Sequence, residues 1–293
     1  MALFISALIV GVSLGTIYGL MAFGVVACYR ISRVVNFGQA GVAALSASLY
    51  WWAATIWGAP LIVSLFGAIL VGAGCGAVLG YFNLRMTNVP KGLVMIFTLT
   101  ISLLLFALVD VILPSYNASP PSIFGSGGFN VALTYVTWDQ IGSLVTSILA
   151  VVITTWMLRK TSFGLFVRAI YDDPGGAATV GVPLAAYVVG VWAIAGAMAG
   201  LGGILVSTRT GLDSPLLLFV MVWGLAGAVL GGLESFVLAF VGGMVLGVAE
   251  GLIGGMLSSD LGPGLENVIA IVIMAAGVLY AGTKRRHLAH LQT

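Results

Sequence analysis

The sequence predicts an all-α protein, a polytopic bundle of about eight or nine transmembrane helices. Its composition is 60% hydrophobic and only 7% charged, whereas soluble domains are about 25% charged. Mean hydropathy is +1.16. Apolar runs reach about 20 residues, the length with which a helix crosses a bilayer, and the ~10-residue alternation of membrane barrels is absent. We therefore expect an integral membrane protein.

Nine segments are apolar enough to be spans. They are approximately 5–28, 39–57, 61–83, 93–113, 139–158, 185–206, 215–232, 236–256 and 266–283. The seventh and eighth are short and closely spaced, so this pair could instead be one span plus a re-entrant element. No basic stretch precedes the first segment, which therefore resembles a retained span and not a cleaved signal peptide. We expect one membrane domain over residues 1–293.

The basic residues predict an orientation with the N-terminus outside and the C-terminus inside. That arrangement places ten of the eleven Lys and Arg residues in the cytoplasm, as the positive-inside rule requires. They are Arg30, Arg33, Arg85, Lys91, Arg159, Lys160, Arg168, Lys284, Arg285 and Arg286. Only Arg209 falls outside. The loop at about 114–138 has no Lys or Arg, so it is expected to be external, and a cysteine at Ser126 should be labelled from outside.

The absence of several sequence motifs reduces the number of functions that the chain could have. The only histidines, His287 and His290, lie in the polar tail, so we expect no metal site and no catalytic residues. No P-loop or Gly-x-Ser-x-Gly motif occurs, so this chain should bind no ATP and should not be an enzyme. The basic residues are too scattered for nucleic acid. Cys28 and Cys75 lie in apolar runs, where no disulfide is expected. A transport role remains, and an external energy source is the simpler hypothesis because no strongly charged membrane pathway is visible.

Glycines recur at intervals of four along three segments, which places them on one helix face where backbones can approach closely. They are Gly243, Gly247, Gly251 and Gly255 in the eighth segment, Gly72, Gly76 and Gly80 in the third, and Gly196 and Gly200 in the sixth. The ladders could pack within this chain, or they could form a subunit interface or moving seam. The sequence does not separate these alternatives.

Three carboxylates lie in or near spans, where such groups are costly. Asp110 lies near the outer end of its helix and Glu234 in a short turn, so both should reach water. Glu250 lies midway along the eighth segment, beside its glycines. It is either a neutral acid hydrogen-bonded to a neighbouring helix, or a gate or subunit contact.

The stretch at 29–41, YRISRVVNFGQAG, joins the first two spans without a hydrophilic loop. Irregular backbone at membrane depth survives where it is buried in protein or lines a cavity. We therefore place Asn36, Phe37 and Gln39 near a translocation pathway. The alternative is that Asn36 simply caps the second span.

The segment at 159–183 concentrates charge: Arg159, Lys160, Arg168, Asp172 and Asp173. It also carries the signals of a short helix. Asp172 or Asp173 is a suitable N-cap for a helix that has Pro174 at its first position, continues over 175–180 and stops at Gly181. Ala177, Ala178 and Val180 would offer a modest apolar face. This segment is either a docking element for a partner or a solvated loop that obeys the orientation rule.

Three stretches resemble permeases of the branched-chain amino acid ABC transporter family. The first matches that family's cytoplasmic loop at Thr161, Gly164, Arg168, Ala169, an acidic residue at 172 or 173, Ala177 and Gly181. The others are residues 18–41 and 222–252. Gly38, Gln39 and Ala40 replace the Ala, His and Gly that are usual in that family. Glu234 occupies a turn position where the family more often has Gly. Because the first departure lies in the presumed pathway, the resemblance does not identify the solute.

The resemblance implies a membrane subunit of a bacterial ABC importer in the cytoplasmic (inner) membrane. It would move branched-chain amino acids or a related small solute. Its partners would be a second homologous permease, an extracytoplasmic solute-binding protein and two ATPases that carry the ATP and Mg. The ATPases would grip the coupling loop at about 159–184, through Arg168, Asp172, Asp173, Pro174, Ala177 and Gly181. The alternative function is an ATP-independent channel or facilitator for a small neutral solute such as urea or an amide. A membrane-embedded enzyme or assembly factor is a more distant third.

Overall fold

The computed structural model describes residues 2–112, 118–125, 127–131 and 134–256, together with the single positions 268, 272, 275 and 276. The helices are α1 (Ala2–Ser32), α2 (Gln39–Trp51), the π-helix η1 (Trp52–Ile56), α3 (Leu61–Arg85), α4 (Lys91–Ile112), α5 (Trp138–Lys160), α6 (Ser162–Asp172), α7 (Pro174–Thr179), α8 (Leu184–Thr210), α9 (Ser214–Leu230) and α10 (Phe236–Met256). Most of the predicted ninth span, the histidine-bearing tail and Ser126 lie outside the described residues.

The all-α fold class is confirmed. Within the described residues, six helices are long and apolar enough to cross a membrane: α1, α3, α4, α5, α8 and α10. The predicted segment at 39–57 is α2 continued by η1, and α9 is a shorter apolar helix. α9 begins after Leu212, whose backbone N–H donates to the Ala118 carbonyl, and it ends before Glu234, which lines a cavity together with Arg30. It therefore runs from one end of the bundle towards the other.

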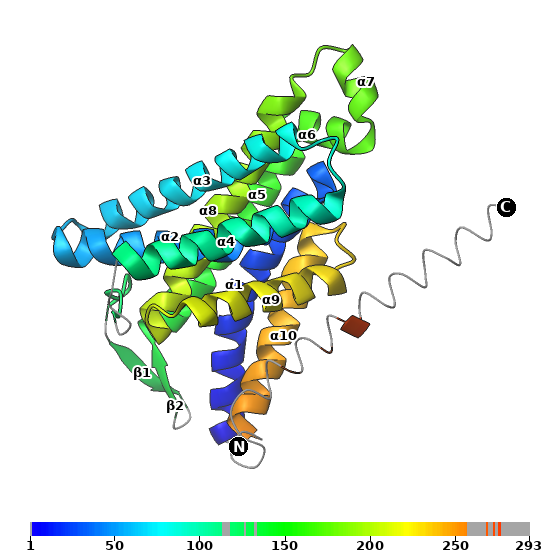
Figure 1. The fold of residues 1–293 in the computed structure, drawn as a ribbon. Helices are drawn as coiled ribbons and strands as arrows, with labels where there is room; N and C mark the ends of the chain where they lie inside the picture. Colours follow the sequence, from blue (N-terminus) through cyan, green and yellow to red (C-terminus); the bar gives the residue numbers. More distant parts are fainter. Residues whose placement is uncertain are drawn as a thin grey trace.

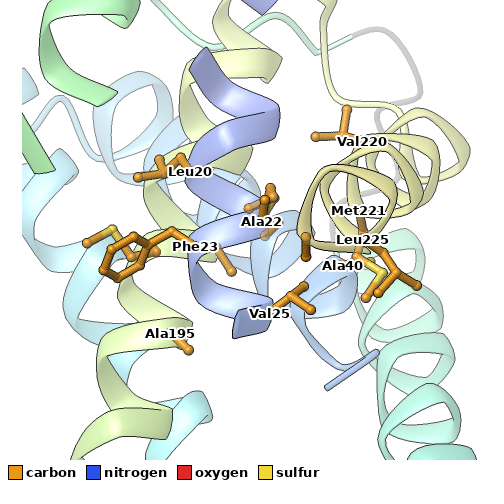
Figure 2. Close-up of a cluster of buried hydrophobic side chains, with 14 of the residues drawn as sticks. Leu20, Ala22, Phe23, Val25, Ala40, Ala195, Val220, Met221 and Leu225 are labelled. Atoms are coloured by element: carbon orange, nitrogen blue, oxygen red, sulfur yellow. The ribbon is translucent and has the colours of Figure 1, made fainter. Parts of the chain in front are cut away.

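α1, α2, α8 and α9 form the buried centre of the bundle. Figure 2 shows its apolar core, with Leu20, Ala22, Phe23 and Val25 of α1 meeting Ala40 of α2, Ala195 of α8, and Val220, Met221 and Leu225 of α9. In Figure 1, α1 and α10 run side by side, while α3 and α4 cross the bundle on another side. The outer helices turn large apolar side chains outward, including Leu70, Val111 and Trp156. In water such a surface would be unstable, but in a bilayer it faces lipid.

The charged residues separate to the two ends of the bundle. Arg30, Arg159, Lys160 and Arg168 surround one cavity. Arg209 lies at the other end, where its Nη1 donates to Ser13 Oγ at 2.9 Å, in the N-terminal half of α1. This separation is the pattern that the positive-inside prediction requires. The chain is a multi-pass protein whose basic end we expect in the cytoplasm.

The external loop contains a small β-hairpin that the sequence analysis did not anticipate. β1 (Gly128–Val131) pairs antiparallel with β2 (Thr134–Thr137). Thr137 then caps α5, because its hydroxyl accepts from the backbone of Gln140 and the Gln140 side chain accepts from the backbone of Thr137. Tyr50 Oη donates to the Pro121 carbonyl at 2.9 Å, which ties the loop to α2. The described part of the loop therefore covers the end of the bundle that we predict to be external.

Candidate functional site

A tight elbow joins α5 to α6. Thr161 sits at this elbow: its hydroxyl donates to the Met157 carbonyl at 2.6 Å and accepts from the Gly164 backbone at 3.3 Å. Gly164 is required here because a Cβ at this position would collide with the Leu158 carbonyl oxygen. The Thr and Gly of the loop motif therefore build the turn itself.

Arg168 reinforces the same elbow. Its Nε donates to the Gly164 carbonyl at 3.2 Å and its Nη2 to the Arg159 carbonyl at 3.3 Å. Basic side chains commonly satisfy the carbonyl groups left free at a helix C-terminus. Arg168, which we predicted to contact an ATPase, is thus already engaged in holding α5 and α6 together.

α6 is attached to two core helices. The rings of Phe163 and Phe166 each lie 5.3 Å from the ring of Tyr187 on α8. On the other side, the guanidinium groups of Arg30 and Arg33 lie over the ring of Tyr171 at 4.5 and 4.7 Å. Movement of α6 would therefore be transmitted to both α1 and α8.

The predicted short helix is present as α7, and Figure 1 shows it at one tip of the molecule. Asp173 is its N-cap residue and Pro174 its first residue, while Asp172 is the last residue of α6. The helix ends at Thr179, and Gly181 adopts φ +82°, a backbone conformation that favours glycine. The local signals in the sequence located this element to within one residue.

One residue of α7 differs from the prediction. Ala177 was expected on the face offered to a partner, but it is buried against Ile170 and Val182. The reason is that α7 folds back onto α6 and must cover the apolar side of that helix. Ala178 of α7 and the C-cap residue Val180 are exposed, and Val180 is 79% exposed.

The loop between α1 and α2 is buried and held by hydroxyl groups of α4. Thr98 Oγ1 accepts the Phe37 N–H at 3.2 Å, and Ser102 Oγ accepts the Gly41 N–H at 2.8 Å. The N-cap residue of α2 is Gly38, not Asn36. Asn36 still has a local role, because its Oδ1 accepts the Gly38 N–H at 2.9 Å. Sequence reasoning missed Thr98 and Ser102, whose spacing of four on one helix face was the available signal.

Gln39 is fully buried at the start of α2. Its side chain lies across Gly24 of α1 and beside the thiol of Cys28, which is a weak hydrogen-bond partner. Among the described residues, the amide of Gln39 has no hydrogen-bond partner other than this thiol. A thiol is a weak partner, and a buried polar group left without any partner costs about 1–3 kcal/mol, so this amide is poorly satisfied in this conformation.

The α10 glycines pack against glycines of α1 in the same chain. A Cβ on Gly243 would lie 2.6 Å from Gly19 Cα, and one on Gly251 would lie 2.6 Å from Gly11 Cα. Gly247 meets Gly15 between them. We call these six residues the glycine seam. Glu250 is half-buried on α10 next to Gly251, and the surroundings of Gly255 lie outside what the structure describes.

The glycines of α3 form a second close contact, with α8. Gly76 approaches Gly196 so closely that a Cβ on Gly76 would lie 3.0 Å from Gly196 Cα. Gly72 meets the Gly196 carbonyl, and Gly80 meets Trp192. Both ladders therefore have partners inside this chain.

An all-helical bundle with lipid-facing outer helices and one exposed helical element at its basic end defines a multi-pass membrane protein. Comparison with known sequences identifies its kind. The family model described as the branched-chain amino acid transport system permease component matches residues 7–278. The chain belongs to this family and is a membrane permease of the ABC transporter class, located in the inner membrane.

Three relatives indicate how far the similarity extends. The probable branched-chain amino acid transport permease protein LivH of Methanocaldococcus jannaschii is 27% identical over 274 residues, covering 89% of this chain and 86% of that protein. The LivH protein of Escherichia coli K12 is 26% identical over 298 residues, covering 94% and 95%. The fructose import permease protein FrcC of Rhizobium meliloti is 26% identical over 192 residues, covering 61% and 50%.

Proposed function

We propose that this chain is the membrane subunit of an importer for branched-chain amino acids or a closely related small solute. Similarity to the branched-chain permeases extends over about nine-tenths of the chain, whereas similarity to the fructose permease extends over 61% of it. The more extensive match supports an amino acid over a sugar.

ATP hydrolysis would take place on two partner ATPases, which supply the ATP and Mg sites. A second permease and an extracytoplasmic solute-binding protein would complete the complex. The observation that carries this proposal is the attachment of α7: Ala178 on one side is exposed, while Ala177 on the other side is buried against Ile170 of α6. α6 in turn contacts α1 and α8 through aromatic and cation–π contacts. A partner that moves α7 would therefore move the core.

Gln39 supports a pathway role for the loop at 36–39. Its buried amide costs stability in this conformation, and a change in the packing of α1, α2 and α8 would give that amide access to water or solute. Asn36 and Phe37 would act mainly by shaping the loop, since Asn36 Oδ1 and the Phe37 N–H are already bonded.

Co-purification tests the proposal. The tagged chain, expressed with the genes that flank its own, should bring down two ATPases and a second permease. Uptake by the purified chain alone, with neither ATPase nor ATP present, would contradict the proposal and support a facilitator.

A further inference from the structure

The basic end of the bundle contains a cavity of about 510 Å³ whose walls carry an excess of positive charge. It lies between the ends of α1 and α5, α6 and the turn before α10. Its charged and aromatic lining residues are Arg30, Arg159, Lys160, Arg168, Tyr171, Glu234 and Phe236. Four cations thus face one carboxylate, which makes the cavity suited to an anion.

An apolar groove of about 370 Å³ continues from this cavity along the outside of the bundle, between α5 and α10. Its walls include Ile148, Val152, Trp156, Val237 and Phe240. Arg159 and Lys160 line both the groove and the cavity, so they stand at the junction of the two. The combined site has a cationic head and an apolar channel.

The other two cations of the cavity already have partners within the chain. Arg30 lies over the rings of Tyr171 and Phe236, and Arg168 is bonded to two backbone carbonyls. An anion at the junction of the cavity and the groove would therefore lie against Arg159 and Lys160.

The dimensions match one leaflet of a bilayer. Ile148 and Lys160 lie on the same helix, about 18 Å apart along its axis. Half of a hydrocarbon core of ~30 Å is about 15 Å. The groove therefore extends from the membrane interface towards the midplane, a depth that a water-soluble ATPase or a free phosphate does not reach.

We propose that this site binds one anionic phospholipid of the leaflet at the basic end. The phosphate would sit between Arg159 and Lys160, with the headgroup directed into the cavity, and an acyl chain would lie in the groove against Val152, Trp156 and Val237. Basic pockets between transmembrane helices are known to hold anionic headgroups, which supports this assignment. The proposal does not depend on the solute or on the partner ATPases.

Native mass spectrometry of the purified full chain tests the site, with dioleoyl phosphatidylglycerol and dioleoyl phosphatidylcholine offered in equal amounts. The wild type should retain one phosphatidylglycerol in preference. Each basic side chain near anionic lipid contributes about fivefold in affinity, so Arg159→Gln/Lys160→Gln should weaken retention by about 25-fold. Val237→Trp should also lose the lipid, because it fills the groove while leaving the charges in place.

The matched control is Arg85→Gln/Lys91→Gln, which removes two positive charges at the same end, outside the cavity. It should retain phosphatidylglycerol like the wild type. Equal retention of the two lipids, equal loss in this control, or displacement of the lipid by soluble glycerol phosphate would each overturn the proposal.

Discussion

The backbone N–H of Val182 donates to the carbonyl oxygen of Ala177 at 3.1 Å, and both side chains are buried beside Ile170 of α6. This contact closes the turn after α7 and attaches it to the helix before it. α6 and α7 therefore form one packed unit, which can transmit a push on α7 to the core.

The geometry of this unit depends on Gly181, whose φ of +82° places it in the region that disfavours a side chain. Gly181→Ala should cost about 1–2 kcal/mol locally, distort the Val182–Ala177 contact and lower ATP-driven uptake severalfold. The control is Gly58→Ala, which carries a similar strain at φ +63° near the other end of the bundle, where nothing lies within 4 Å. Uptake by reconstituted complexes measures the effect, and an equal loss in both variants would show that strain alone is responsible.

The glycine seam should be intolerant of side chains. Gly247→Val inserts a side chain where Gly15 backbone already lies, and overpacking of this kind costs about 1–3 kcal/mol or more. Thermal unfolding in detergent should show a midpoint lower by several degrees. Gly74→Val is the control, since nothing surrounds Gly74 within 4 Å and its midpoint should be nearly unchanged. A seam variant as stable as this control would refute the close packing of α1 and α10.

The seam also shows where sequence reasoning ends. A spacing of four residues fixes the helix face on which Gly243, Gly247 and Gly251 lie. It does not name the helix that covers this face, because that choice depends on the packing of the whole bundle. The same limit explains why the contacts from Thr98 and Ser102 to the loop at 36–41 were missed.

Local features, in contrast, were predictable. Pro174 and Gly181 mark the start and stop of α7 through their own backbone preferences. The basic residues identify one end of the bundle because the positive-inside rule depends only on where Lys and Arg lie in the sequence. The burial of Ala177 was not predictable, since it depends on how α7 folds back onto α6. The β-hairpin of this loop was likewise not predicted, because the Pro, Ser and Gly residues of the loop are typical of irregular structure.

Gln39 gives a way to separate stability from transport. Gln39→Leu removes a buried amide whose partner among the described residues is only the weak Cys28 thiol, so the protein should be as stable as the wild type or more stable by about 1 kcal/mol. If this amide meets the solute during transport, uptake should fall about tenfold, as expected when a hydrogen bond worth ~1.4 kcal/mol is lost.

Asn83→Leu is the matched control, because Asn83 is also a buried amide with an unsatisfied oxygen, on α3. Its uptake should remain near the wild-type level. Wild-type uptake by Gln39→Leu would instead assign Gln39 to structure and move the pathway elsewhere.

The orientation can be checked with single cysteines in a background where Cys28 and Cys75 are replaced. Asn130 on β1 and Thr87 after α3 are both exposed, and the predicted orientation places them on opposite sides of the membrane. A membrane-impermeant maleimide added to intact cells should label Asn130→Cys directly and Thr87→Cys only after permeabilisation. The reverse pattern would invert the topology and place α7 outside the cell.

ATP-driven uptake by the reconstituted complex is the most direct test of α7 as the ATPase contact. Val180→Asp places a charge on the exposed side of α7 without touching the packed unit beneath it. Thr87→Asp adds the same charge to another exposed turn at the same end. We predict that Val180→Asp lowers uptake and ATPase co-purification about tenfold or more, as for an interface residue worth ~1.4 kcal/mol, while Thr87→Asp behaves like the wild type. Wild-type uptake by the Val180→Asp complex would contradict the coupling role.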